Sequence, residues 1–175
     1  MRKLILGLAV SLDSFIEGPN GEYDWCFTDQ DYGMTEFLQH VDTMFMGRKS
    51  YELTQTMKGG TGLPKMKEYI FSTTLRETKN DAILVRGNIE EEVKRIKSEK
   101  GKDIWLFGGA SLTNSLMKLY LVDELWLAVH PILLGAGKPL FSGNDKRIHL
   151  TLLESKTYDS GLVSLKYKLK GAKPK

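Results

Sequence analysis

The 175-residue chain, with 41% hydrophobic and 27% charged residues, is long enough for one domain whose core needs no disulfide or metal. No apolar run approaches the roughly 18 residues of a membrane helix, the net charge of +3 is too weak to indicate nucleic-acid binding, and the single cysteine excludes an internal disulfide. We therefore expect a soluble, cytoplasmic protein with one domain over residues 1–170 and a frayed basic tail over residues 171–175.

Apolar runs bounded by turn residues predict a series of strands, at about residues 3–11, 43–46, 69–72, 82–85, 103–107 and 124–130. Helix-like segments lie between most of them. The clearest helix covers residues 89–100, with Asn88 as its cap and Gly101 as its stop. This alternation predicts an α/β protein with a mostly parallel central sheet and helices on both of its faces.

The pattern changes near the end of the chain, where strands follow one another without helices. Residues 150–158 and 162–169 are joined by a short turn that contains glycine, which predicts an antiparallel C-terminal hairpin. Lysines alternate along the end of the second strand and just beyond it, at Lys166, Lys168 and Lys170, so we expect one lysine face in contact with solvent.

One predicted strand runs directly into a pair of glycines, Gly108 and Gly109, after which a helix begins. Glycines let the backbone approach an anion closely, and the free amides at a helix start bind phosphate oxygens at the positive end of the helix dipole. Tight packing between a strand and a helix also favours glycine. The spacing matches neither a Rossmann fingerprint nor a Walker motif, so both interpretations stay open here.

A second strand ends at Gly47 and is followed by a helix start with two cations and a hydroxyl, Arg48, Lys49 and Ser50. The helix dipole opposes cations at this end, so an external anion would stabilise them. The alternative is that they are ordinary surface residues. Two strand-to-helix turns, one rich in glycine and one basic, are together suited to one long polyanionic cofactor.

Polar residues also follow the next two predicted strands, with Ser72 and Thr73 after the first and Arg86 after the second. In an open parallel sheet the carboxyl ends of the strands meet at one edge, where ligands bind. Turn formation and a solvated cation explain each segment better when it is taken alone. Taken together, the polar residues at these strand ends favour a ligand site.

Four segments, in the expected order, resemble the dihydrofolate reductase superfamily: residues 11–16 (SLDSFI), 46–52 (MGRKSYE), 107–112 (FGGASL) and 121–137. The resemblance covers nearly the whole chain and is closest to the reductase domain of the bifunctional riboflavin-biosynthesis deaminase/reductase. It implies a three-layer α/β/α, dihydrofolate reductase-like fold and NADPH-dependent hydride transfer. The implied activity is similar to that of 5-amino-6-(5-phosphoribosylamino)uracil reductase, and the riboflavin branch implies a homodimer.

The resemblance also assigns residues to the cofactor. It implies a pyrophosphate turn and a second phosphate-binding helix start at Phe107, Gly108, Gly109, Ala110, Ser111 and Leu112 and at Gly47, Arg48, Lys49 and Ser50. Arg48 would face the adenosine 2′-phosphate with Ser72 and Thr73, and Arg86 lies at the same edge. A guanidinium with hydroxyls is the chemistry that selects NADPH over NADH. Ala9 and Ile16 match positions that flank the nicotinamide.

Reduction of a C=N bond needs a proton for the nitrogen as well as a hydride for the carbon. Dihydrofolate reductases use a carboxylate near the start of the helix after the first strand, and Asp31 is the closest match, with Asp29 beside it. Burial beside apolar walls would raise the pKa of Asp31 and favour its protonation. Alternatively, Asp31 caps a helix at residues 32–40. Asp13 is the second candidate acid, although it also suits a role in shaping its loop.

The sequence departs from the riboflavin reductases where these hold the ribosyl phosphate. Their Asp-Asp-Pro-x-Leu-x-x-Arg pattern is replaced by residues 56–64 (TMKGGTGLP), and Ser14 replaces a glycine of the family's Ser-Leu-Asp-Gly motif. We therefore expect a stand-alone reductase that acts on a pterin- or pyrimidine-like C=N substrate. The alternatives are a genuine dihydrofolate reductase and a non-catalytic NADPH-binding module. Three scattered histidines give no support to a metal site.

Overall fold

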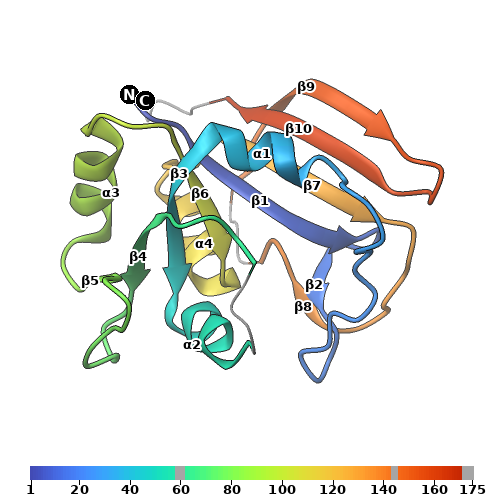
Figure 1. Ribbon diagram of the computed structural model, residues 1–175. Coiled ribbons are helices and arrows are strands. Elements are labelled where there is room, and N and C mark those ends of the chain that lie inside the picture. The colour runs from blue at the N-terminus through green and yellow to red at the C-terminus, as the bar shows by residue number, and fades with distance from the viewer. Residues whose placement is uncertain (58–61, 143–145, 171–175) are drawn as a thin grey trace.

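The computed structural model describes residues 1–57, 62–142 and 146–170, so the predicted basic tail lies outside the described residues. Its centre is an eight-stranded sheet with the order β5-β4-β3-β6-β1-β7-β10-β9 (Figure 1). The strands are β1 (Leu4–Ser11), β3 (Val41–Gly47), β4 (Lys67–Phe71), β5 (Ile83–Val85), β6 (Asp103–Gly108), β7 (Glu124–His130), β9 (Leu150–Thr157) and β10 (Val163–Leu169). From β5 to β7 neighbouring strands are parallel, whereas β10 is antiparallel to both β7 and β9. The predicted fold class and C-terminal hairpin are confirmed.

Helices cover both faces of this sheet, with α3 (Ile89–Ser98) and α4 (Ala110–Lys118) on one face and α1 (Met34–His40) and α2 (Arg48–Thr56) on the other (Figure 1). Successive strand residues alternate between the two layers. Leu4 and Leu6 of β1 are therefore buried with α3 and α4, while Ile5 is buried with Phe37 of α1 and Tyr51 of α2. Each fully buried aliphatic side chain contributes about 1.5–3 kcal/mol to stability.

The helix predicted at residues 89–100 forms over Ile89–Ser98. Its cap is confirmed, because Asn88 Oδ1 accepts hydrogen bonds from the amides of Glu90 and Glu91 at 3.0 and 3.4 Å. The helix ends before Gly101, since the backbone at Glu99 is already extended. None of the helices among the described residues is both long and apolar enough to cross a membrane.

Strands β1 and β6 separate as they approach their carboxyl ends. They pair only from Leu4 with Ile104 to Leu6 with Leu106. Beyond that point β6 continues beside β3, and β1 continues beside β7 as far as Ser11. Just after β1, a small antiparallel sheet joins β2 (Phe15–Glu17) to β8 (Lys138–Pro139). The separation opens a space at the edge of the sheet where the predicted ligand-binding turns lie.

Ser14, in the turn between β1 and β2, has a φ of 69°, which is a left-handed backbone conformation that glycine adopts more easily. We therefore expect Ser14→Gly to raise the free energy of unfolding by about 1 kcal/mol, measured by urea denaturation. Asn80 has a similar φ of 57°, but asparagine tolerates this conformation better, so Asn80→Gly should stabilise less. A Ser14→Gly protein that is no more stable than the wild type would contradict this account.

Candidate active site

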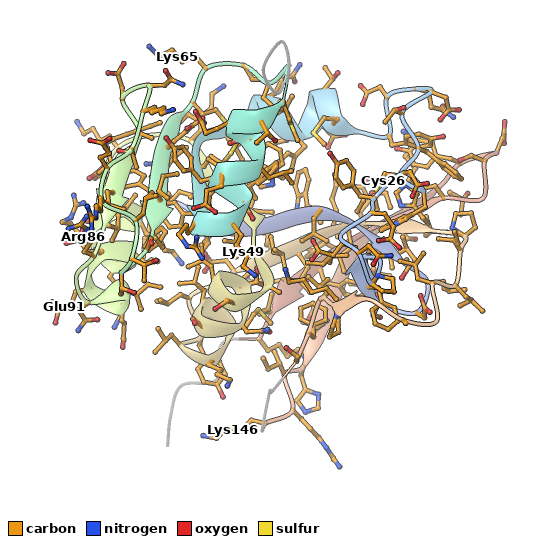
Figure 2. All side chains as sticks on the ribbon, turned by 90° about the horizontal axis from the view of Figure 1, so that it is seen from below. Cys26, Lys49, Lys65, Arg86, Glu91 and Lys146 are labelled. Carbon is orange, nitrogen blue, oxygen red and sulfur yellow. The ribbon has the colours of Figure 1, made fainter. Side chains whose placement is uncertain are left out.

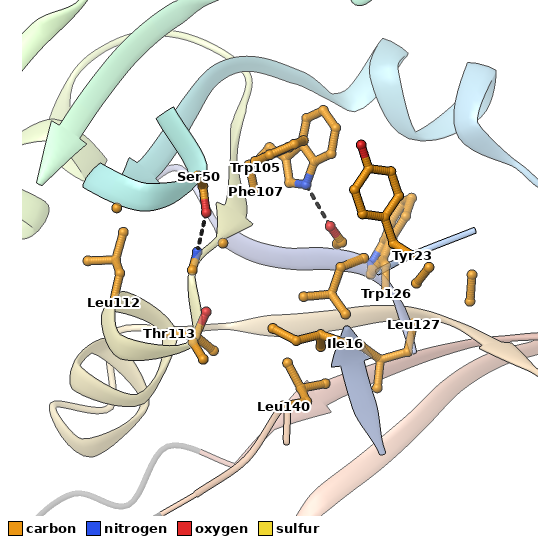
Figure 3. A pocket seen from close by; sticks show the side chains of 18 of the residues that line it. Ile16, Tyr23, Ser50, Trp105, Phe107, Leu112, Thr113, Trp126, Leu127 and Leu140 are labelled. Carbon is orange, nitrogen blue, oxygen red and sulfur yellow. Dashed lines mark hydrogen bonds between the residues drawn. The ribbon is translucent and has the colours of Figure 1, made fainter. Parts of the chain in front are cut away.

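A cavity of about 1350 Å³ opens at the carboxyl ends of the parallel strands, beyond the point where β1 and β6 separate (Figure 3). It runs from α2, α4 and the ends of β4 and β5 to α1 and the β9–β10 hairpin. Cavities for drug-sized ligands have volumes of about 300–1,000 Å³, so this one has room for a dinucleotide and a second small molecule. Every residue that the sequence analysis assigned to the cofactor lines this one cavity.

The glycine pair at the end of β6 has a backbone that other residues rarely adopt, with φ of +134° at Gly108 and +31° at Gly109. A Cβ added at Gly108 would meet no atom within 4 Å, so the space beside this glycine is open. Helix α4 begins immediately afterwards, at Ala110. The first amides of a helix have no partner within it, which leaves donors for an anion at this end of α4.

The two predicted phosphate-binding turns are joined by a hydrogen bond. The amide of Gly109 donates to Ser50 Oγ at 3.0 Å (Figure 3). The Gly109 amide is therefore used within the protein, while the hydroxyl hydrogen of Ser50 can still be donated to an anion. This bond fixes the start of α2 against the start of α4, so that the two helix starts open to the same cavity.

The cations at the start of α2 differ in their surroundings. Arg48 Nη1 lies 2.9 Å from Glu52 Oε1, one turn along the helix, and its side chain is 42% exposed. Lys49 is exposed and lies where α2 and α4 approach each other (Figure 2). Exposed pairs of this kind contribute little to stability, so Arg48 can leave Glu52 for a more highly charged partner.

The polar residues after β4 and β5 build a turn as well as line the cavity. Ser72 Oγ accepts hydrogen bonds from the amides of Thr74 and Leu75, at 3.2 and 3.0 Å. Arg86 Nη2 donates to the carbonyl oxygens of Leu75 and Arg76, at 2.6 and 2.7 Å. The turn-forming interpretation of Ser72 is correct, and Arg86 holds that turn in place.

The burial and the raised pKa expected for Asp31 are not found. Asp31 is exposed and is not among the residues that line the cavity. Its Oδ1 accepts hydrogen bonds from the amides of Gly33 and Thr35, and those from the Thr35 side chain and backbone lower its pKa instead of raising it. Helix α1 begins at Met34, two residues later than predicted, so Asp31 belongs to the turn that leads into the helix.

Asp13, the second candidate acid, shapes its loop. The Ser11 hydroxyl donates to Asp13 Oδ1 at 2.6 Å, and the amides of Leu134 and Gly135 donate to the same carboxylate at 3.1 and 2.8 Å. These hydrogen bonds, led by the one from Ser11, lower the pKa of Asp13. The carboxylate therefore joins the end of β1 to the loop after β7.

The part of the cavity under α1 contains residues that the sequence analysis did not select. Aromatic side chains there include Trp105, whose Nε1 donates to the carbonyl oxygen of Gly7 at 2.8 Å, and Trp126 (Figure 3). Lys166 was expected on a solvated face, but its side chain is only 13% exposed and pairs with Glu36 and Glu154. The only sequence signals for the ion pairs of Lys166 were an acidic residue in the first turn of a helix, Glu36, and the alternating strand that contains Lys166.

His130, at the end of β7, holds the segment before α1 and is neutral. Its Nε2 accepts a hydrogen bond from the amide of Phe27 at 3.0 Å, and its Nδ1 lies 3.0 Å from the carbonyl oxygen of Ala128, to which it must therefore donate. The ring also makes edge contacts with Trp25 and Phe27. Burial lowers the pKa of His130 from its usual value of 6.5.

We expect this histidine to make the protein less stable in acid. Because its pKa is lower in the folded state, the unfolded chain binds the proton first as the pH falls below about 6.5, so the free energy of unfolding falls from there down to the folded pKa. Chemical denaturation at several pH values should show this slope, and His130→Gln should reduce it. His149→Gln, which changes an exposed histidine, should leave it unchanged. Equal slopes for wild type and His130→Gln would contradict the prediction.

Comparison with known proteins places this arrangement in a family. The chain matches the family model of the RibD C-terminal domain over residues 2–164. It belongs to the RibD C-terminal domain family. The uncharacterized protein YyaP of Bacillus subtilis (strain 168), for example, is 45% identical in an alignment that covers 97% of this chain and 96% of YyaP.

Solved structures confirm the dihydrofolate reductase-like fold. A candidate riboflavin biosynthesis protein from Shewanella sp. PV-4 is similar with a TM-score of 0.84 and 24% identity, covering 96% of this chain and 99% of that one. Dihydrofolate reductase from Enterococcus faecalis, in complex with NADP(H), is similar with a TM-score of 0.69 and 12% identity, covering 96% of each chain. At these identities the likeness concerns the fold. The predicted resemblance to this superfamily and to the riboflavin reductase domain is confirmed.

Within the RibD C-terminal domain family, the sequence departure at residues 56–64 has its described ends beside the cavity. Residues 58–61 of this segment lie outside the described residues. On either side of them, Met57 and Leu63 line the cavity with apolar side chains. The described ends of the segment thus contribute apolar surface to the cavity.

Proposed function

We propose that this protein is an NADPH-dependent reductase that transfers a hydride to a C=N bond of a pterin- or pyrimidine-like substrate. The observation that carries the proposal is the convergence of two helix starts, joined by the bond between Ser50 and Gly109, on one large cavity. Arg48 and Lys49 add positive charge at the first of them. Two helix starts with two cations match a polyanionic dinucleotide. Family membership supports a reductase, and the NADP(H) complex of the Enterococcus faecalis enzyme supports the cofactor.

The described residues fit NADPH along its length. The open backbone at Gly108 and the first amides of α4 would hold the pyrophosphate, with the Ser50 hydroxyl as a further donor. Arg48 and Thr73 would bind the adenosine 2′-phosphate, because both line the cavity and both are partly or fully exposed to it. Ile16 and Ala9 would provide apolar contacts for the nicotinamide.

The chemistry of the reaction belongs to the cofactor, which supplies the hydride when it is bound, and the protein aligns the two ligands. The substrate nitrogen must also gain a proton. Asp13 and Asp31 do not fit as its source, because accepted hydrogen bonds lower both pKa values and keep both carboxylates ionised at neutral pH. We assign the proton to solvent water that enters the open cavity. The alternative of a genuine dihydrofolate reductase keeps the support of the same cofactor-binding elements but loses that of Asp31.

A second candidate is a non-catalytic NADPH-binding module. It is favoured by one observation, that the two carboxylates selected as acids are engaged in turns and have lowered pKa values. This candidate and the reductase share the cofactor site and differ only in turnover.

Fluorescence titration and NADPH oxidation test the proposal together. Binding of NADPH should quench tryptophan emission, because Trp105 and Trp126 line the cavity, and NADPH should bind more tightly than NADH. Equal, millimolar affinity for both would refute the cofactor assignment. Oxidation of NADPH with a panel of reducible pterins, pyrimidines and imines would support the reductase. Tight binding without turnover across the panel would favour the module.

We also propose a homodimer through the free edge of β9. All residues of this strand are exposed, including Leu150, Leu152 and Leu153, and its outer edge has no neighbouring strand in the described sheet. An exposed edge with apolar side chains is a template for pairing with a second copy. Light scattering at tens of micromolar should show a dimer, and a monomer there would refute the proposal.

A further inference from the structure

One end of the cavity, away from the phosphate-binding turns, has a wall made of four side chains from four elements. Glu36 comes from α1, Trp126 from β7, Glu154 from β9 and Lys166 from β10, and all four line the cavity. The register places Lys166 beside both Trp126 and Glu154 in neighbouring strands. We call these four residues the Lys166 wall.

The lysine in this wall is fully engaged by the protein. Lys166 Nζ lies 2.8 Å from Glu36 Oε1 and 2.9 Å from Glu154 Oε2. It also lies 4.1 Å from the centre of the Trp126 ring, in a cation–π contact. The Lys166 ammonium is already surrounded by two carboxylates and an aromatic face. It can therefore contribute little to the binding of an incoming anion.

The charges of the wall therefore favour some ligands over others. Glu36 and Glu154 are 57% and 50% exposed, so their remaining oxygen lone pairs face any ligand that reaches the wall. The nearby Lys156 lines the cavity too, with its Nζ 5.0 Å from the ring of Tyr158, and brings the local formal charge to zero. Together with Lys156, the wall thus has no net positive charge with which to attract a phosphate group. N–H groups on the edge of a ring would find acceptors.

The rings near the wall add a preference for flat ligands. Phe37 meets both Trp105 and Trp126 edge to face, with ring centres 5.1 Å apart in each case. The indole N–H groups of both tryptophans are already used, by the Gly7 carbonyl oxygen and by Glu124. What these rings offer to the cavity is therefore apolar aromatic surface, which suits a planar partner.

We propose that Glu36, Lys166 and Glu154 restrict the second ligand of this cavity to a flat, neutral or cationic nitrogen heterocycle that carries no phosphate group. This inference rests on the proposed function, because it describes the substrate that would meet the cofactor. It removes phosphoribosyl compounds from the substrate class and keeps ring compounds with N–H groups on their edge.

A matched pair of ligands tests it, 5-amino-6-ribitylaminouracil and its 5′-phosphate, which share one ring and differ by the phosphate. Isothermal titration into the NADPH-saturated protein should show the unphosphorylated compound binding at least tenfold more tightly. Equal or tighter binding of the phosphate would overturn the inference, and so would the failure of both compounds to bind. NADPH affinity is measured first on the same sample. Absence of NADPH binding would refute the proposed function. NADPH binding together with tighter binding of the phosphorylated compound would refute the inference alone.

Two variants of the wall should move this ratio in opposite directions. Glu36→Gln combined with Glu154→Gln leaves the ammonium of Lys166 for the phosphate, so the preference should fall at least tenfold. Lys166→Met keeps an unbranched apolar stem beside Trp126 but removes the cation that pairs with Glu36 and Glu154. The phosphorylated compound should then bind even more weakly. Glu99→Gln, a glutamate paired with Lys67 and Arg95 away from the cavity, should leave the ratio unchanged. Thermal melts check that each variant folds, and an unchanged ratio in both folded wall variants would overturn the inference.

Discussion

Ser111→Asp is expected to weaken NADPH binding about a hundredfold and at the same time to make the protein slightly more stable. Ser111 is exposed in the first turn of α4 and lines the cavity. Two like charges about 5 Å apart repel by about 3 kcal/mol at an effective dielectric constant of about 20, which is roughly a hundredfold in affinity. A carboxylate near a helix start, however, stabilises the helix by about 0.3–1 kcal/mol.

The opposite signs of the two effects make this a sharp test, because a damaged fold would lower both quantities. Fluorescence titration gives the affinity, and urea denaturation gives the free energy of unfolding. Ser98→Asp adds the same charge at an exposed position of α3 that does not line the cavity, and should leave NADPH affinity unchanged. If Ser111→Asp bound NADPH as tightly as the wild type, the pyrophosphate would not lie at the start of α4.

Arg48→Ala is expected to lower the affinity for NADPH about 30-fold, because hydrogen bonds from a cation to a charged group contribute about 1.5–3 kcal/mol. The affinity for NADH should hardly change, since NADH has no 2′-phosphate. The measurement is the ratio of the two dissociation constants. Loss of the pair between Arg48 and Glu52 should affect stability little, because both side chains are exposed.

A control variant for Arg48→Ala is available in another helix, α3. Arg95→Ala removes an exposed arginine that pairs with Glu92 and Glu99 but does not line the cavity, and the ratio should stay as in the wild type. Glu52→Gln should act in the other direction from Arg48→Ala, because it frees the guanidinium and should tighten NADPH binding a few-fold. A ratio that responds to neither variant would place the 2′-phosphate elsewhere.

The rim of the cavity was predictable because its causes are local. Apolar runs define the strands, and the carboxyl ends of neighbouring parallel strands must share one edge. Gly108 ends its strand and Arg48 directly follows its own, so knowing the strands and their direction was enough to bring these residues together at the rim. The bond between Ser50 and Gly109 was not predictable, since it depends on how closely α2 approaches α4.

The surroundings of Asp31 differ from the expectation for a reason that residue spacing does not show. Asp31 is the closest match to the family's carboxylate when residues are counted back from Gly47, but helix α1 starts two residues later than predicted, and the carboxylate accepts hydrogen bonds from the turn before it. Whether a side chain beside a helix start faces the cavity or the solvent depends on the exact residue at which the helix begins. Sequence patterns locate such boundaries least well.

The sequence by itself determined the order of strands and helices, the C-terminal hairpin and the residues at the rim, because periodicity, caps and glycine turns act over a few neighbouring residues. Only the tertiary structure decided what lies under α1. Lys166 pairs there with Glu36, which is 130 residues away in the chain. An alternating strand shows which residues share a face, but whether that face meets water or a ligand cavity depends on which element is packed over it.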